Sequence, residues 1–403
     1  MEPTTHKTKL NLEHKPQESK DWNEVFHLIS DWDIEKIAAT KVMVVGAGAL
    51  GNEVLKNLAL LNIGHIFIVD FDEIEYSNLS RSVLFRNHFV GQPKAAVAAA
   101  RVKELNPNVK VQYVNGDILC DVGLGIFKRM DVIIGCLDNR VARLYINRHT
   151  FKVGKTWVDG GIMNLDGQLA VYNQESACYE CQLGNLDQDM IRKRLSCADM
   201  ATRNSNYGRI PTTPLSASII GAMQVQEAIK IVFGQKKSSL AGQKFNYYGM
   251  ANEYLVYPMT TERLTCESHE VIQSIIPSDL SSDHSVERTL EWLEHHFESD
   301  NIQIILHYDI VLEAVTKKTE KEYQLIVPKP HFSDAMVRKY EEIPYEGIVF
   351  SKRISSIDRS FPDLNYTLKE LAIPPLHILK VKVDDSKVHY VELSADISFL
   401  NFK

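Results

Sequence analysis

The sequence predicts an α/β protein, with a Rossmann-like, mostly parallel sheet followed by a smaller C-terminal α+β domain. Between residues 40 and 160, short apolar runs rich in β-branched residues alternate with helix-like segments, a pattern typical of parallel sheets with crossover helices. A glycine-rich turn, Gly46-Ala-Gly48-Ala-Leu-Gly51, directly follows the first of these runs. After residue 285 the alternation ends, which indicates a different kind of domain.

The domain organisation follows from these changes of pattern. The first twenty residues are polar and lack periodicity, so we expect a flexible tail. A Pro-Ser-Asp-Leu-Ser-Ser-Asp stretch within 272–285 is typical of a linker. The expected parts are therefore a tail (1–20), an α/β domain (21–272) that includes a crossover loop (182–213), and a C-terminal domain (285–403).

The secondary structure of the first domain is predicted from hydrophobic periodicity. Apolar residues between Trp22 and Ala39 repeat at helical spacing, so an amphipathic helix is expected there. The expected strands are 42–45, 65–69, 109–114, 132–136, 156–159 and 168–172, and the expected helices are 50–61, 94–105, 139–152 and 215–233.

The C-terminal domain is predicted to contain a helix over 285–297 and strands over 302–307 and 323–327. Near the end, a short helix and a turn after Tyr366 lead into a strand, and a final strand over 388–393 pairs back.

The glycine-rich turn predicts a nucleotide site. Glycines between a buried strand and a helix let the backbone approach a phosphate, and the helix N-terminus favours the anion. Asp70 follows Gly51 by about twenty residues, the spacing expected of a ribose-binding carboxylate. This pattern alone fits a dinucleotide oxidoreductase as well as an ATP-binding enzyme.

Polar residues after the second strand favour ATP. Asp70, Asp72, Asn78, Arg81 and Lys94 follow one another closely, and hydride transfer has no need of such a set. Arginine and lysine can hold the β- and γ-phosphates and neutralise charge as pyrophosphate leaves. Either cation alone would more often be a solvated surface residue. Together with the glycines, the set points to ATP.

Five motifs, in order and spacing, make the chain resemble the ubiquitin-activating superfamily, which includes adenylyltransferases of molybdopterin and thiamine biosynthesis. They are Gly-x-Gly-x-x-Gly, Asp-x-Asp, Asn-Leu-x-Arg, Gly91-Gln-Pro-Lys and Cys136-Leu-Asp138-Asn139, and the resemblance covers roughly 40–270. It implies that Asp70 binds the ribose, that Asn78, Arg81 and Lys94 hold phosphates, and that Asp138 holds magnesium. Bacterial relatives carry an N-terminal arginine that enters the partner subunit's ATP site, but this sequence has no arginine before Arg81.

Two cysteine pairs suggest a metal site. Cys178-Tyr-Glu-Cys181 could be a redox pair, half of a metal site or a coincidence, and no thioredoxin-like unit supports redox use. Cys266-Glu-Ser-His269 supplies a second pair, so three thiolates and one imidazole could bind structural zinc. A buried set without metal is the alternative. Relatives place a second Cys-x-x-Cys at this point, and here His269 replaces its last cysteine.

Cys197 is the candidate nucleophile. It follows Arg192, Lys193 and Arg194, and nearby cations lower a thiol pKa and favour the thiolate. An arbitrary free cysteine is more often a packing residue. The resemblance implies that Cys197, before Pro211-Thr-Thr, takes the acyl group from the adenylate, although the insertion 201–209 lengthens this loop. Cys120 and Cys136 are interpreted as core residues.

Composition limits the other classes of function. The 403 residues are 44% hydrophobic with a net charge of −7, which gives no support to nucleic-acid binding. We expect no membrane span and no signal peptide. Six unevenly spread cysteines indicate a reducing cytoplasm, where they stay free for metal binding or catalysis.

The resulting hypothesis is an activating enzyme for a ubiquitin-like protein. It would adenylate the modifier's C-terminal glycine with ATP and magnesium, form a thioester on Cys197 and pass the modifier to a conjugating enzyme. The end of the chain resembles the ubiquitin-fold domain that recruits such an enzyme, and relatives suggest a homodimer. The alternatives are an adenylyltransferase for a sulfur-carrier protein, without an enzyme thioester, and a non-catalytic partner subunit.

Overall fold

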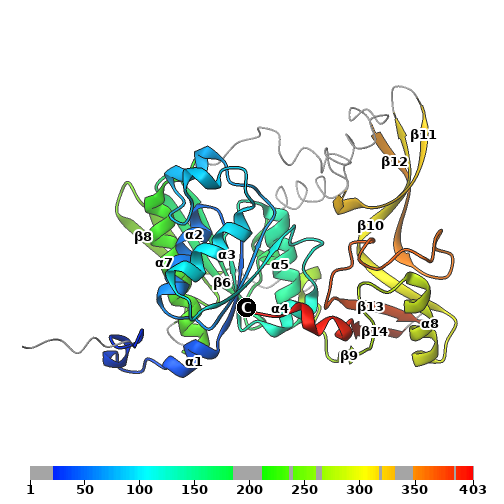
Figure 1. The fold of residues 1–403 in the computed structure, drawn as a ribbon, viewed down its shortest axis with the longest axis horizontal. Coiled ribbons are helices and arrows are strands. Elements are labelled where there is room, and N and C mark those ends of the chain that lie inside the picture. Colours follow the sequence, from blue (N-terminus) through cyan, green and yellow to red (C-terminus); the bar gives the residue numbers. More distant parts are fainter. Residues whose placement is uncertain are drawn as a thin grey trace, which may run out of the picture.

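The computed structural model describes residues 21–184, 211–235, 239–259, 266–316, 320–331, 348–384 and 387–402. Its largest element is an eight-stranded sheet in the order β3-β2-β1-β4-β5-β6-β7-β8 (Figure 1). The strands from β3 to β5 are parallel, and β6, β7 and β8 are added antiparallel. The strands are β1 (Lys41–Val45), β2 (His65–Asp70), β3 (Lys110–Asn115), β4 (Val132–Gly135), β5 (Thr156–Met163), β6 (Asp166–Tyr172), β7 (Gln243–Tyr248) and β8 (Glu253–Pro258).

Helices cover both faces of this sheet, which explains why its central strands are continuous apolar runs. On β1, Val42 and Val44 face one core, with α2 and α7, whereas Met43 and Val45 face a second core, with α4 and α5. Among its described residues, this domain has the helices α1 (Ile34–Ala39), α2 (Ala49–Leu60), α3 (Lys94–Leu105), α4 (Leu124–Arg129), α5 (Arg140–Lys152) and α7 (Pro214–Val232). Short 3₁₀ segments are η1 (Phe26–Leu28), η2 (Tyr76–Ser80), η3 (Asn87–Phe89), η4 (Glu180–Gln182) and η7 (Glu267–His269).

A second, smaller sheet forms the C-terminal region. Its order is β11-β10-β13-β14-β9, and β12 pairs with β10. Helix α8 (Val286–Phe297) packs Leu290 and Leu293 into the core of this region, beside Ile304 and Val381. The strands are β9 (Ile276–Pro277), β10 (Ile302–Thr316), β11 (Glu322–Pro328), β12 (Ile348–Ile357), β13 (Ile378–Val383) and β14 (Lys387–Glu392), with η8 (Lys329–His331) and η10 (Ser394–Phe399). The predicted fold class is thus confirmed, while the ubiquitin-fold interpretation stays a prediction.

The two sheet regions are joined by direct contacts. Leu376 and Ile378 complete the core on which α4 and α5 pack. The Arg129 guanidinium pairs with the buried Glu392 carboxylate, and the backbone N–H of Gly125 donates to the Leu376 carbonyl at 2.9 Å. The C-terminal region therefore packs against α4 and is not a free appendage.

The structure corrects three expectations about local structure. The predicted helix from Trp22 to Ala39 is wrong: Asp31 has a left-handed φ of 64°, and α1 starts only after Asp33, whose side chain caps it. The expected linker at 272–285 contains β9, which pairs with β14. The short helix expected after Tyr366 is a series of turns. The tail expected at 1–20 lies outside the described residues.

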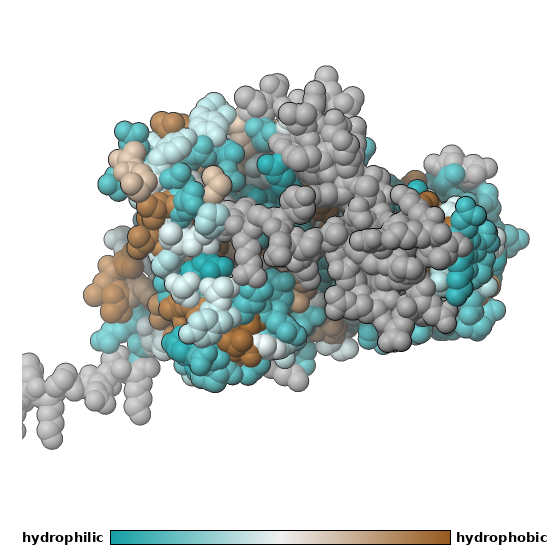
Figure 2. Space-filling model, turned by 90° about the horizontal axis from the view of Figure 1, so that it is seen from above, coloured by the Kyte–Doolittle hydropathy of each residue, from teal (hydrophilic) through white to brown (hydrophobic). Residues whose placement is uncertain are grey.

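Apolar side chains are exposed at the β8 end of the large sheet. All six residues of β8 are exposed, including Leu255 and Val256, and α7 exposes Leu215 and Ile219. Figure 2 shows hydrophobic surface at this end of the molecule. Among the helices that the structure describes, none is long and apolar enough to cross a membrane.

Candidate functional site

The glycine turn is packed tightly at two of its three glycines. Gly46 has a φ of 95°, and a Cβ there would lie 2.5 Å from the Cys136 carbonyl oxygen. A Cβ on Gly51 would lie 1.9 Å from the Gly46 carbonyl oxygen, so this glycine allows α2 to approach the turn. A Cβ on Gly48 would meet nothing within 4 Å. Gly46 and Gly51 are therefore required by packing, whereas Gly48 faces space that a phosphate can enter.

Asp70, at the end of β2, is hydrogen-bonded to the glycine turn. One carboxylate oxygen accepts a hydrogen bond from the backbone N–H of Ala47 at 2.6 Å, and the other accepts from that of Asp72 at 2.8 Å. Burial raises the pKa of Asp70, while the Lys94 charge and these hydrogen bonds lower it. A carboxylate offers about four acceptor positions, so it can still accept a ribose hydroxyl while it supports the turn.

Lys94 begins α3 and is paired with Asp72. Its ammonium lies 2.8 Å from an Asp72 carboxylate oxygen, and its backbone N–H donates to the Asp72 carbonyl. The Lys94 side chain is 11% exposed, whereas that of Asp72 is 46% exposed. The ion pair thus keeps a cation beside Asp70, at the edge of the sheet.

Asn78 and Arg81 belong to the η2 segment after β2. The Asn78 carboxamide oxygen accepts from the backbone N–H of Glu75 at 3.0 Å, which closes a capping box. The Arg81 guanidinium donates to the Ser77 carbonyl at 2.7 Å in an exposed position. This contact uses one of five guanidinium N–H groups and leaves most of its donor capacity for a ligand.

Asn52, which is fully buried on α2, is a residue of this site that was not predicted from the sequence. Its side-chain N–H group donates to the carbonyls of Ala47 (2.7 Å) and Gly48 (3.0 Å), and its oxygen accepts from the backbone N–H of Leu84 (2.8 Å). Asn52 therefore ties the glycine turn to the segment that carries Arg81. An amide directly after the third glycine of the motif was the available signal.

Asp138 lies on the loop after β4 and is exposed. Asn139 caps α5, and the buried Arg143 donates to the Leu137 carbonyl at 2.6 Å. Arg143 also pairs with the buried Asp159 at 3.0 Å, which holds the loop against β5. Because β2, β1 and β4 are parallel neighbours, the glycine turn, Asp70 and the Asp138 loop all lie at the carboxyl edge of the sheet, where ligands of open α/β sheets bind.

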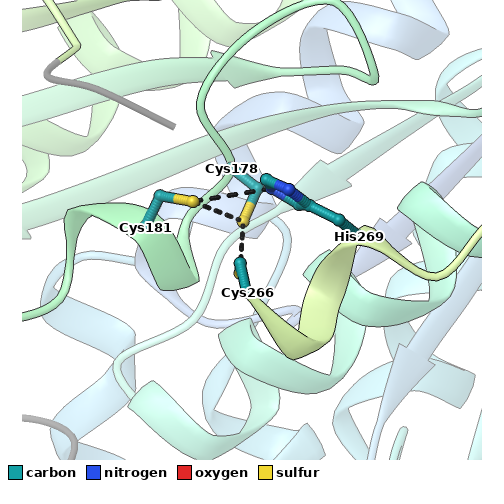
Figure 3. Close-up of side chains that lie close together, drawn as sticks. All are labelled: Cys178, Cys181, Cys266 and His269. Carbon is teal, nitrogen blue, oxygen red and sulfur yellow. Dashed lines mark hydrogen bonds between the residues drawn. The ribbon is translucent and has the colours of Figure 1, made fainter. Parts of the chain in front are cut away.

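The two cysteine pairs come together as predicted from the sequence. The Cys178 Sγ lies 3.6 Å from the sulfurs of both Cys181 and Cys266, and the Cys181 Sγ lies 3.5 Å from the His269 Nε2 (Figure 3). All four ligand atoms lie within 4.8 Å of one another. A tetrahedral zinc ion with Zn–S bonds of about 2.3 Å separates its sulfurs by about 3.8 Å. The cluster therefore fits structural zinc, with four protein ligands and no open position.

Side chains around this cluster connect its two halves. Arg148 on α5 donates to Glu180 (2.9 Å), beside the first pair, and to Glu267 (2.7 Å), beside the second. The His269 ring stacks on Phe151 at 4.6 Å. Burial raises the pKa of the Cys178 and Cys266 thiols, and a divalent cation would offset this cost by binding the thiolates.

Cys197 lies outside the residues that the structure describes, as does most of the crossover loop, from 185 to 210. Thr213, at the end of this loop, caps α7, and its hydroxyl donates to the Asn164 carbonyl at 3.1 Å. Cys120 is buried and Cys136 is half-buried. Burial raises the pKa of Cys136 well above its usual range, in keeping with its interpretation as a core residue.

Comparison with known proteins identifies the family. The profile of the ThiF family matches residues 22–268, which is more than half of the chain. The chain belongs to the ThiF family. This confirms the resemblance to the superfamily that contains ubiquitin-activating enzymes and sulfur-carrier adenylyltransferases.

Individual relatives of this ThiF-family chain come from both branches. It is 32% identical over 219 residues to the sulfur carrier protein adenylyltransferase of Thermus thermophilus, covering 53% of this chain and 76% of that protein. It is 34% identical over 166 residues to SUMO-activating enzyme subunit 2 of Dictyostelium discoideum, but this match covers 41% of this chain and a quarter of that subunit. Among solved structures, E. coli MccB with succinimide aligns with a TM-score of 0.48 and 22% identity, over 58% of this chain and 68% of that one.

Proposed function

We propose that this chain uses ATP to adenylate the C-terminal glycine of a ubiquitin-like protein, and then holds that protein as a thioester on Cys197. The observation that carries the proposal is the arrangement at the carboxyl edge of the large sheet. There, an open position at Gly48 lies at the start of α2, and Lys94 is held beside Asp70 by Asp72. Membership of the ThiF family supports ATP as the nucleotide.

In this proposal the backbone turn and the cationic residues bind the phosphates, and the carboxylates bind the ribose and magnesium. The turn formed by Gly46, Gly48 and Gly51 and the N-terminus of α2 bind phosphate oxygens. Arg81 and Lys94 neutralise the charge that develops as pyrophosphate leaves, and Asn78 contributes an amide. Asp70 binds the ribose, with Asp72 beside it, and the exposed Asp138 carboxylate would hold magnesium on the phosphates.

The chemistry has two steps. A carboxylate oxygen of the modifier's terminal glycine attacks the α-phosphorus of ATP, and the bond to pyrophosphate breaks. The Cys197 thiolate then attacks the acyl carbon of the adenylate, and AMP leaves. The modifier would next pass to the cysteine of a conjugating enzyme, and the C-terminal domain would recruit that enzyme.

A second candidate function is adenylation of a sulfur-carrier protein, with no thioester on the enzyme. The coverage of three-quarters of the Thermus thermophilus adenylyltransferase favours this candidate. Cys197 and the C-terminal region, neither of which this candidate needs, favour the first. A third hypothesis is a non-catalytic partner subunit, which the absence of an arginine before Arg81 would favour. The presence of Asp70, Arg81, Lys94 and Asp138 argues against it.

The proposal includes a cytoplasmic location, structural zinc in the cysteine–histidine cluster and a homodimer. The exposed apolar residues of β8 and α7 support an interface with a second protein or a second copy. The net charge of −7 supports neither nucleic acid nor an anionic membrane as a partner.

The test is to incubate the purified chain with ATP-Mg and a candidate modifier that ends in glycine, and to run a non-reducing gel. A thiol-sensitive adduct that is absent in Cys197→Ala is expected. ATP–pyrophosphate exchange without an adduct in either protein would favour the sulfur-carrier function. Neither exchange nor adduct with members of both substrate classes would favour the non-catalytic subunit.

A further inference from the structure

A second group of metal-ligating side chains lies where the two sheet regions meet. Cys120 and Asp121 belong to the turn between β3 and α4, and His331 ends η8, after β11. Their sulfur, carboxylate oxygen and imidazole nitrogen all lie within 4.8 Å of one another. No residue of this group belongs to the cysteine–histidine cluster. None belongs to the proposed nucleotide site at the carboxyl edge of the large sheet either, which is called the nucleotide edge below.

The turn that carries Cys120 and Asp121 is held in a fixed shape. One Asp121 carboxylate oxygen accepts from the backbone N–H of Asp117 at 2.7 Å. A Cβ on Gly116 would lie 2.6 Å from that same oxygen, so the glycine makes room for the carboxylate. The Cys120 thiol also hydrogen-bonds to the Asp121 carboxylate, so two of the three side chains are already in contact.

The C-terminal sheet holds this turn from the other side. The imidazole of His307, on β10, lies with its Nε2 3.1 Å from the Leu119 carbonyl oxygen. Leu119 is the residue before Cys120, and its own backbone N–H donates to the Asp117 carboxylate at 3.0 Å. His331 follows β11, which pairs with β10, so its approach to the turn is fixed by the same sheet.

We propose that Cys120, Asp121 and His331 form a second zinc site, which joins the two sheet regions. A thiolate, an imidazole and a carboxylate are the three ligand types that zinc takes in proteins, and a water molecule would complete the tetrahedron. Cys120 is 3% exposed, so a small cation suits this position better than a macromolecular substrate does. Magnesium and calcium are disfavoured because they prefer oxygen ligands alone.

The turn that would bind this zinc is also hydrogen-bonded to the strand end that carries Asp70. The turn begins at Gly116, whose backbone N–H donates to the Asp70 carbonyl at 3.2 Å. Asp70 and Asn115 are also register partners on β2 and β3. An ion bound to this turn and to His331 would therefore fix the C-terminal sheet against the strand end that carries Asp70.

The test is the zinc content of the full-length chain, measured by inductively coupled plasma mass spectrometry after incubation with excess zinc and desalting. We expect Cys120→Ser and His331→Gln each to hold one zinc equivalent per chain less than the wild type. Cys136→Ser is the matched control, because it removes another non-surface cysteine, and it should keep the wild-type content. Far-UV circular dichroism checks that each variant is folded.

Cobalt substitution provides a readout that does not depend on zinc affinity. The comparison is made in a Cys266→Ser background, in which the other cluster has already lost a ligand. There, cobalt bound by Cys120 still adds a sulfur-to-cobalt absorption band, and a further Cys120→Ser change removes that band. The proposal is overturned if folded Cys120→Ser and His331→Gln keep the wild-type zinc content. It is also overturned if their zinc loss equals that of Cys136→Ser.

Discussion

In the cysteine–histidine cluster the functional side chains face one another, whereas at the nucleotide edge they are held by hydrogen bonds to the backbone and by one ion pair. The three sulfurs and the imidazole of the cluster all lie within 4.8 Å of one another, and three of their contacts measure 3.5–3.6 Å. At the edge, the Asp70 carboxylate accepts from two backbone N–H groups, and Lys94 pairs with Asp72.

The difference indicates which site needs its ligand in order to fold. Buried thiols packed together gain little from one another, and a bound cation supplies the missing interaction. Asp70, Arg81 and Lys94 already have partners, so this part of the edge keeps its shape before a nucleotide arrives, which is the preorganisation that catalysis requires. Changes in the cluster should therefore affect stability, and changes at the edge should affect activity.

The largest effect is expected from Cys266→Ser, which breaks the cluster. Loss of a structural metal belongs to the small class of changes that cost about 4–5 kcal/mol or more. The variant should lose one zinc equivalent and this much free energy of unfolding, measured by urea denaturation. Cys136→Ser, as the control, should keep its zinc. An unchanged unfolding free energy in Cys266→Ser would show that the cluster binds no structural ion.

The opposite outcome is expected from Arg81→Ala at the edge. The rate of ATP–pyrophosphate exchange with an accepted carrier or modifier should fall by about 10²–10³-fold, as for removal of a charge-stabilising group. The free energy of unfolding should change by less than about 0.5 kcal/mol, because the Arg81 contact to Ser77 is exposed. Arg86→Ala is the matched control, since Arg86 is an exposed arginine five positions along that contacts only nearby carbonyls in the structure. Equal exchange in both variants would contradict the role of Arg81.

Gly51 and Gly48 belong to the same turn, but their substitution should affect different properties, stability for Gly51 and ATP binding for Gly48. Gly51→Ala should cost about 1–3 kcal/mol of unfolding free energy, because its Cβ would lie 1.9 Å from the Gly46 carbonyl oxygen. Gly48→Ala should cost about 1 kcal/mol or less, as expected at a helix N-cap with open space, and should weaken ATP binding. If calorimetric titration gives the same ATP affinity for wild type and Gly48→Ala, the phosphate does not enter at Gly48.

The contact between the two regions offers a test by pH. His377 is buried, its Nδ1 has no hydrogen-bond partner among the described residues, and burial, with smaller effects of His307 and Lys152, lowers its pKa to about 3. Between pH 6.5 and 3 the unfolded chain binds a proton at this imidazole that the folded chain does not, so stability falls as the pH drops.

Between pH 6.5 and 5 this effect amounts to about 2 kcal/mol. Urea denaturation at both pH values should therefore show a loss of stability that is smaller by about that amount in His377→Leu than in the wild type. An equal loss in the two proteins would mean that His377 does not contribute to the pH dependence.

The sequence predicts the parts of this molecule that depend on local pattern. Apolar runs such as Val42–Val45 predicted strands because both faces of the sheet are covered. The two Cys-x-x-(Cys/His) pairs, together with the family resemblance, predicted their cluster. What it failed to predict depends on contacts between distant segments. Asn52 gains its role only when Leu84 lies beside it, and Ile276 becomes a strand residue only because β14 is adjacent. The helix expected before Ala39 is interrupted by the left-handed backbone at Asp31, which periodicity does not report.

Binding of ATP at the sheet edge can be measured by calorimetric titration of the wild type and Lys94→Met with ATP-Mg and with NAD. This measurement does not require the partner protein to be known. We expect ATP-Mg to bind the wild type more tightly than NAD does, and Lys94→Met to weaken ATP-Mg binding by at least about tenfold, the loss expected for one charge-assisted contact to phosphate. If NAD binds more tightly than ATP-Mg and Lys94→Met leaves NAD binding unchanged, the sheet edge is not an ATP site. The glycine turn would then indicate an NAD-dependent oxidoreductase.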